Sequence, residues 1–299
     1  LQEGGALNFY DLTGKANYNI NKRNRIFISG YTGRDKFFFD KNQGFSWGNN
    51  TGTIRWNKIF NDRLFANFSG IFSRYDYSLQ FGENDLDNFK WNSSIRNVTF
   101  KPSFSYFINA SNEISFGGEV NYYSFEPANA SGTSNGDEID ISLPEKYNLE
   151  SALYLGNSQR LTSKIFVDYG LRFSYFTGFG PGTQYTYNDT IPGRRRTVIS
   201  EENFEQGEVT STYQNFEPRV SMKIELNEVS SVKASYNRMA QYLHLISNTT
   251  ASNPLDVWTP SSNNTKPELS DQWALGYFRN LGKEQMFEFS VEAYYRKTQ

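Results

Sequence analysis

The sequence has no cysteine and a single histidine in 299 residues. The absence of cysteine excludes disulfides, thiolate metal ligands and cysteine nucleophiles. With His244 alone, a Ser-His-Asp triad or a histidine metal site has at most one candidate residue. Neighbouring carboxylates such as Glu201 and Glu202 lie in polar stretches typical of solvated loops. The sequence therefore predicts no catalytic residue, no metal site and no cofactor, and we expect that the protein is not an enzyme.

Long apolar runs and a strong net charge are also missing. No stretch of about 18 apolar residues occurs, which excludes a transmembrane helix. The net charge of −2 offers no basic surface for nucleic acid. Aromatic residues are nevertheless abundant, with 26 Phe and 20 Tyr, although the mean hydropathy is only −0.66. This combination suits strands that face lipid on one side and water on the other.

A two-residue alternation of apolar and polar side chains is the strongest pattern in the chain. It is clearest in residues 165–175 and 216–226, where an aliphatic or aromatic residue occupies nearly every second position. Successive side chains of a strand point to opposite faces, so such a segment has one apolar face and one polar face. We expect Val167, Tyr169 and Leu171 to face lipid, and Asp168, Gly170 and Arg172 to face a water-filled interior.

About twelve segments show this pattern, and short polar turns alternate with longer loops between them. The predicted strands are residues 6–20, 25–39, 51–60, 64–81, 97–106, 114–122, 147–156, 161–179, 216–226, 232–243, 269–281 and 286–298. The longer loops are residues 40–50, 126–146, 180–214 and 244–266. The pattern predicts an all-β, antiparallel, up-and-down transmembrane β-barrel with large loops on one side.

Several segments resemble the barrel of TonB-dependent outer-membrane receptors of the Bacteroidota type. The segments that carry the resemblance are Asp11-Leu12-Thr13-Gly14-Lys15, Ser29-Gly30-Tyr31-Thr32-Gly33-Arg34-Asp35, Asn215-Phe216-Glu217-Pro218-Arg219, Ala234-Ser235-Tyr236-Asn237-Arg238 with Gln241, Asp256-Val257-Trp258-Thr259-Pro260 and Lys266-Pro267-Glu268. The resemblance extends over nearly the whole chain, although most of these motifs are diffuse.

The resemblance implies a bacterial outer-membrane location and the uptake of a scarce nutrient, such as a siderophore, glycan or peptide. It also implies three kinds of partner: outer-membrane lipids, TonB acting through an N-terminal plug, and a surface lipoprotein of the SusD type. The family's barrel has 22 strands. Residues 1–299 are therefore expected to form part of a single transmembrane barrel domain, without the plug and without the C-terminal strands.

Two other classes of protein remain open from the sequence. One is a passive porin or an outer-membrane enzyme built on a 12-stranded barrel. The other is a soluble β-rich adhesin, which the length of the predicted strands disfavours, since strands of soluble sheets average about 5–6 residues.

The candidate ligand-binding residues lie in or beside the longer loops. Aromatic side chains there can stack on a sugar or peptide, and a run of three arginines can bind an anionic substrate or lipid phosphates. The alternatives are interface anchoring for the aromatics and a solvated loop tip for the arginines. The candidates are Tyr185, Tyr187, Arg194, Arg195, Arg196, Tyr242, His244 and Trp258.

Overall fold

The computed structural model describes residues 5–39, 43–84, 87–134, 137–188, 196–246, 257–282 and 286–299. Every regular element in these ranges is a β-strand. Across the same ranges, no helix is both long enough and apolar enough to cross a membrane.

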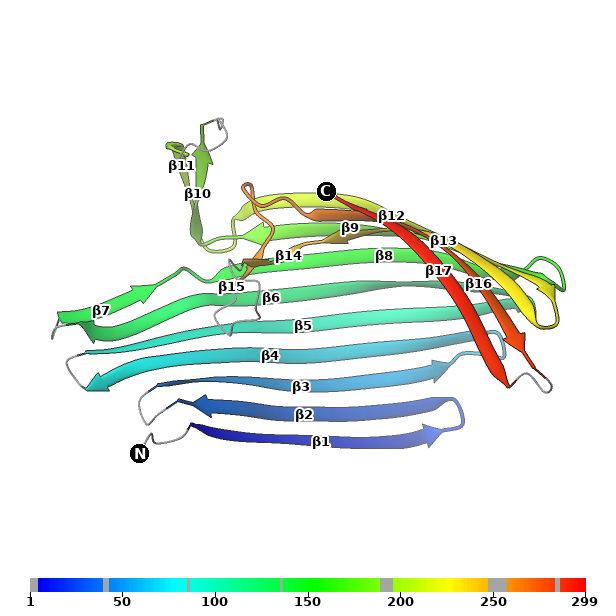
Figure 1. Ribbon diagram of the computed structural model, residues 1–299, viewed down its shortest axis with the longest axis horizontal. Coiled ribbons are helices and arrows are strands. Elements are labelled where there is room, and N and C mark those ends of the chain that lie inside the picture. The colour runs from blue at the N-terminus through cyan, green and yellow to red at the C-terminus, as the bar shows by residue number, and fades with distance from the viewer. Residues whose placement is uncertain are drawn as a thin grey trace.

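Twelve strands form one continuous antiparallel sheet in which each strand pairs with its neighbours in the chain (Figure 1). In sheet order they are β1 (Ala6–Asn21), β2 (Asn24–Phe38), β3 (Gly44–Ile59), β4 (Leu64–Asn84), β5 (Asp87–Asn109), β6 (Asn112–Ser134), β8 (Lys146–Arg160), β9 (Ile165–Phe179), β12 (Val209–Asn227), β13 (Ser230–Gln241), β16 (Glu268–Leu281) and β17 (Phe287–Thr298). A short strand, β7 (Asp137–Ser142), pairs with the far end of β6. The predicted up-and-down order of about twelve strands is confirmed.

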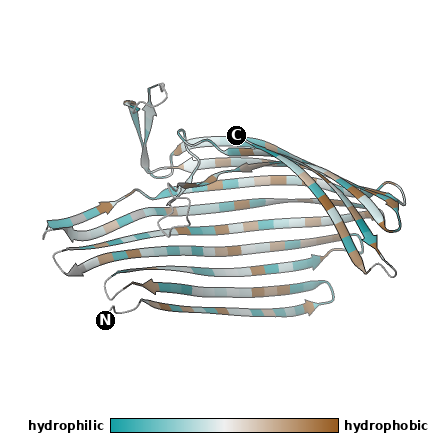
Figure 2. Cartoon of the chain, viewed as in Figure 1, coloured by the Kyte–Doolittle hydropathy of each residue, from teal (hydrophilic) through white to brown (hydrophobic). Residues whose placement is uncertain are grey.

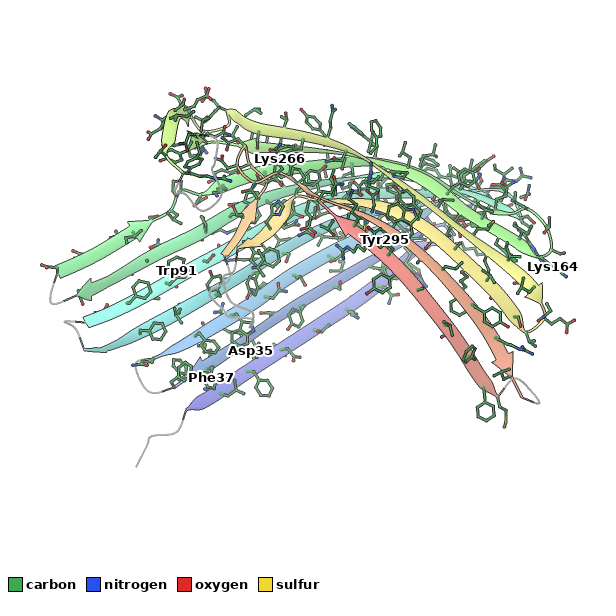
Figure 3. The ribbon with its side chains drawn as sticks, turned by 45° about the horizontal axis from the view of Figure 1, so that its top comes forward. Asp35, Phe37, Trp91, Lys164, Lys266 and Tyr295 are labelled. Atoms are coloured by element: carbon green, nitrogen blue, oxygen red, sulfur yellow. The ribbon has the colours of Figure 1, made fainter. Side chains whose placement is uncertain are left out.

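The two ends of the sheet differ. The connections β1–β2, β3–β4, β5–β6, β8–β9, β12–β13 and β16–β17 are short, and all lie at one end, here called the turn end (Figure 1). The opposite end is the loop end, where Figure 3 places Phe37 and Trp91, whereas Lys164 lies at the turn end. Such asymmetry between the two ends is typical of outer-membrane barrels.

The two faces of the sheet also differ. Large apolar side chains stay exposed along one face, here called the outer face, including Leu153, Leu171 and Leu275, which are 68%, 46% and 58% exposed. The opposite, inner face carries Ser174 and Glu217, which are 0% and 4% exposed. Figure 2 shows the resulting alternation of hydrophilic and hydrophobic residues along the strands. An exposed apolar band of this extent is typical of a surface that contacts lipid.

The loop end is more ordered than the sequence predicted. Strand β3 begins at Gly44, inside the expected loop 40–50, and β6 and β7 occupy much of the expected loop 126–146. The expected loop 180–214 contains β10 (Gly182–Tyr187) and β11 (Val198–Phe204), which form a hairpin that stands away from the sheet (Figure 1). Strands β5 and β6 each have 23 residues, whereas about 9–11 residues cross a bilayer. The sheet therefore extends well beyond the thickness of a membrane.

The sheet is curved and open. In the described residues β1 pairs only with β2, and β17 pairs only with β16. Figure 1 shows β16 and β17 crossing in front of the other strands as the sheet curls. Each edge thus presents unpaired backbone groups, and these cost several kcal/mol per group in hydrocarbon.

Introducing an arginine on the outer face should destabilise the protein far more than the same change on the inner face. We expect Leu171→Arg to lower the free energy of unfolding by about 2–4 kcal/mol, because the charge would sit in the apolar band. Asp168→Arg, three residues earlier on the opposite face, is the matched control and should change stability by less than about 1 kcal/mol. Urea unfolding in lipid vesicles measures both variants, and equal losses would show that the two faces have been assigned incorrectly.

Candidate functional site

The two longest predicted loops meet at the loop end of the sheet. One contributes the β10–β11 hairpin, and the other contributes a ribbon formed by β14 (Leu243–Ile246) and β15 (Val257–Pro260). The side-chain amides of Asn264 and Asn263 donate hydrogen bonds to the backbone carbonyl of Tyr185, at 2.8 and 3.3 Å. These contacts join the hairpin to the chain that follows the ribbon, which sequence reasoning did not foresee.

Hydrogen bonds also fasten the β14–β15 ribbon to the sheet. Lys146 Nζ of β8 donates to Thr259 Oγ1 at 3.1 Å, and Tyr213 Oη of β12 donates to the carbonyl of Ser262 at 2.7 Å. His244 Nε2 lies 2.9 Å from Ser261 Oγ within the ribbon segment. The ribbon is thus fixed against strands that are far away in the sequence.

The predicted aromatic residues differ in their accessibility. Tyr185 and Trp258 are each 37% exposed, and Leu245, the strand partner of Trp258, is 45% exposed. The ring of Tyr187 lies 6.5 Å from that of Tyr185. Exposed, adjacent aromatic surfaces of this kind can stack on a planar or sugar-like ligand.

Tyr242 differs from the accessible stacking residue that the sequence suggested. It is only 2% exposed, and its ring stacks on Phe176 of β9 with ring centroids 5.0 Å apart. Its hydroxyl accepts a hydrogen bond from Asn215 Nδ2 and shares another with Ser174 Oγ, both at 2.8 Å. Tyr242 therefore anchors the start of the ribbon to the inner face of the sheet and offers no accessible ring face to a ligand.

The arginine run is described only in part. Arg196 is exposed, next to Thr197, whose backbone pairs with Asn188. Arg194 and Arg195 lie outside the described residues. Within the described ranges, no group of three or more histidine or acidic side chains could hold a metal ion.

His244 sits in a partly desolvated position. Burial lowers the pKa of its imidazole below the ordinary value, and the charge of Glu268 opposes this shift only in part. The ring is therefore neutral at physiological pH and takes part in the ribbon as a hydrogen-bonding group.

The inner face carries a cluster of ion pairs that was not predicted from the sequence. Arg172 of β9 approaches three carboxylates, at 3.8 Å from Glu119, 3.3 Å from Glu150 and 3.5 Å from Glu217. Lys101 of β5 pairs with Glu119 at 3.0 Å, and Arg219 lies 3.8 Å from Glu217. We call these six residues the luminal ion cluster.

The luminal ion cluster joins five strands, β5, β6, β8, β9 and β12, and its formal charges cancel. The Glu217 side chain is 5% exposed and that of Arg172 is 20% exposed, so water screens the central pairs only weakly. Glu217 and Arg219 belong to the Glu-Pro-Arg motif noted in the sequence. The other members of the cluster are charged residues at polar positions of the alternation, so the sequence alone could have suggested that they face the interior. Which of them meet depends on the register of the strands.

Comparison with known proteins supports the fold. No protein-family model matches the chain, and no curated protein matches its sequence. Among solved structures, it is similar to the copper transporter OprC, with a TM-score of 0.72 and 10% identity over 98% of this chain and 46% of that one. It is also similar to the siderophore receptor PiuA from Acinetobacter baumannii, with a TM-score of 0.67 and 10% identity over 98% of this chain and 50% of that one.

A third similar structure is the ferric citrate transporter FecA, with a TM-score of 0.66 and 11% identity over 99% of this chain and 44% of that one. The chain has the fold of an outer-membrane receptor barrel. It spans about half the length of these three structures.

Removing the central arginine of the luminal ion cluster should destabilise the wall. Arg172→Met leaves three carboxylates close together without their shared cation, so we expect a loss of about 1–3 kcal/mol in the free energy of unfolding. Arg219→Met, at a side chain that is 56% exposed, is the control and should cost less than about 1 kcal/mol. Adding Glu150→Gln to Arg172→Met should recover part of the loss in urea unfolding. If Arg172→Met and Arg219→Met have the same effect, the cluster is not a coupled unit.

The ribbon should weaken in mild acid because of His244. Burial lowers the pKa of His244 in the folded state, so the unfolded chain binds the proton more readily. The neutral imidazole therefore stabilises the folded state fully only above its ordinary pKa of about 6.5. Hydrogen exchange of β14 and β15 should accelerate as the pH falls from 6.5 towards the lowered pKa, after correction for the intrinsic exchange rate. His244→Gln should remove this dependence, and an unchanged dependence in that variant would assign it to another group.

Proposed function

We propose that this chain forms part of the wall of an outer-membrane receptor that takes up a scarce nutrient. The observation that carries the proposal is the twelve-stranded up-and-down sheet with an exposed apolar outer face and a charged inner face. The fold shared with transporters and receptors for copper, siderophores and ferric citrate supports nutrient uptake as the general role.

In this proposal the ligand binds at the loop end and passes along the inner face. The β10–β11 hairpin and the β14–β15 ribbon provide the first contacts, through the exposed rings of Tyr185 and Trp258. Long loops that a rigid scaffold holds on one side are a common place for recognition. The nutrient class stays open among siderophores, glycans and peptides.

The energy source in this proposal is TonB acting through a plug, as the sequence resemblance to Bacteroidota receptors implies. A surface lipoprotein of the SusD type is the further partner which that resemblance suggests. No catalysis is proposed. The open sheet favours this function over a closed 12-stranded porin, because the outermost strands of such a porin would pair with each other.

Replacing the two exposed loop aromatics should weaken nutrient uptake. We expect Tyr185→Ala combined with Trp258→Ala to reduce uptake at limiting nutrient about tenfold, since each stacking contact contributes about 0.5–1.5 kcal/mol beyond its buried area. Tyr106→Ala is the matched control, because Tyr106 is also 37% exposed but lies near the turn end. Growth on limiting nutrient, at equal surface levels of each protein, measures the effect. Unchanged uptake in the double variant would show that these two residues do not bind the nutrient.

Uptake should also stop when the proton-motive force collapses. A passive porin would continue to admit solute under an uncoupler, whereas a TonB-driven receptor would retain bound ligand without releasing it inward. Measuring binding and accumulation of labelled nutrient in parallel separates the two outcomes.

A further inference from the structure

Three arginines mark the border of the apolar band on the outer face. On β4 and β5 the outward-facing Phe72 and Val98 are 46% and 52% exposed. Two residues further towards the loop end, on the same face, these strands carry Arg74 and Arg96. Arg34 of β2 is in register with Asp76 of β4, two residues beyond Arg74 on the same face. We call Arg34, Arg74 and Arg96 the arginine patch.

Arg74 and Arg96 lie directly opposite each other in the register of β4 and β5. Like charges in this position repel one another and destabilise a sheet. Arg96 forms an ion pair with Glu126 at 2.7 Å, and Arg34 forms one with Asp76 at 2.5 Å. In contrast, Arg74 forms no ion pair with any other described residue, and its buried Nε makes no hydrogen bond. Some guanidinium N–H groups of the arginine patch therefore have no acceptor within the chain.

The absence of a side chain at Gly48 of β3 leaves room for the guanidinium of Arg34. Arg34 reaches across β3 to Asp76, and a Cβ atom at the intervening Gly48 would lie only 2.8 Å from Nη2 of Arg34. Any larger residue at Gly48 would have to displace the guanidinium. The observed position of Arg34 thus depends on a glycine in β3, the strand between β2 and β4.

We propose that the arginine patch binds a phosphate group of a lipid in the outer leaflet, with Arg74 and Arg96 as the principal contacts. The proposal rests on the outer-membrane location in the proposed function. A guanidinium presents a planar fork of donors that matches phosphate oxygens, so one phosphate between Arg74 and Arg96 would offset their repulsion.

The occupant is a lipid because the patch continues directly into the apolar band. A phosphate at the arginines places the acyl chains of the same molecule against Phe72 and Val98. The patch also lies on the face opposite to Arg172 and Glu217, so a nutrient in the interior would not reach it.

The test measures binding of a bisphosphorylated lipid A to the protein purified in detergent, by native mass spectrometry. We expect Arg74→Gln combined with Arg96→Gln to weaken binding at least about tenfold, since two charge-assisted contacts are lost. Arg279→Gln is the control, because it removes an exposed outward-facing charge near the turn end. The same lipid without its phosphates should bind the unmodified protein as weakly as the bisphosphorylated lipid binds the double variant.

Two results would overturn the lipid site: equal binding by the double variant and the unmodified protein, or equal binding of the phosphorylated and dephosphorylated lipids. If the double variant does not fold, Arg74→Lys keeps the charge without the planar fork and should show an intermediate loss. Nutrient uptake by the double variant should stay within about twofold of normal, because the patch faces away from the interior. If the double variant loses lipid binding but the unmodified protein takes up none of the nutrients tested, the proposed function is wrong and the lipid site stands.

Discussion

The pairing of backbone hydrogen bonds between neighbouring strands is the constraint on which the rest of this structure depends. In hydrocarbon each unpaired backbone group costs several kcal/mol, so a chain that crosses a membrane as strands must pair them continuously. Continuous pairing fixes the alternation of side chains across the sheet. From that alternation follow the apolar outer face and the polar inner face. The same alternation brings charged side chains of neighbouring strands together, as in the luminal ion cluster and the arginine patch.

The alternation made the twelve strands predictable from the sequence, but it failed towards the loop end. Beyond Phe72, strand β4 carries Arg74 and Asp76 on its outer face, while Tyr77 and Leu79 on its inner face are 4% and 5% exposed. The pattern is inverted there, because the outer face has left the apolar band and the inner face packs against other side chains. A rule that expects apolar residues outside therefore ends strands too early towards the loop end. It placed the start of β5 at residue 97 and the end of β6 at residue 122, whereas β5 begins at Asp87 and β6 continues to Ser134.

The candidate site was predictable in its location but not in its contacts. The loop positions of Tyr185 and Trp258 follow from the spacing of the strands, and both rings are exposed. Tyr242 looks equivalent in sequence, yet it is buried because Phe176, from a strand more than sixty residues earlier, stacks on it. The luminal ion cluster was missed for the same reason, since the relative register of five strands decides which charges meet.

Arginine has opposite roles on the two faces, and the neighbouring carboxylates make the difference. On the inner face Arg172 is surrounded by three glutamates, so its charge is satisfied within the chain and holds strands together. On the outer face Arg74 lies opposite another arginine and forms no ion pair with a described carboxylate. A satisfied charge in a weakly screened position stabilises the wall, whereas an unsatisfied one at the edge of an apolar band favours an external anion. Arginine thus holds strands together on the inner face, and in our proposal it binds lipid on the outer face.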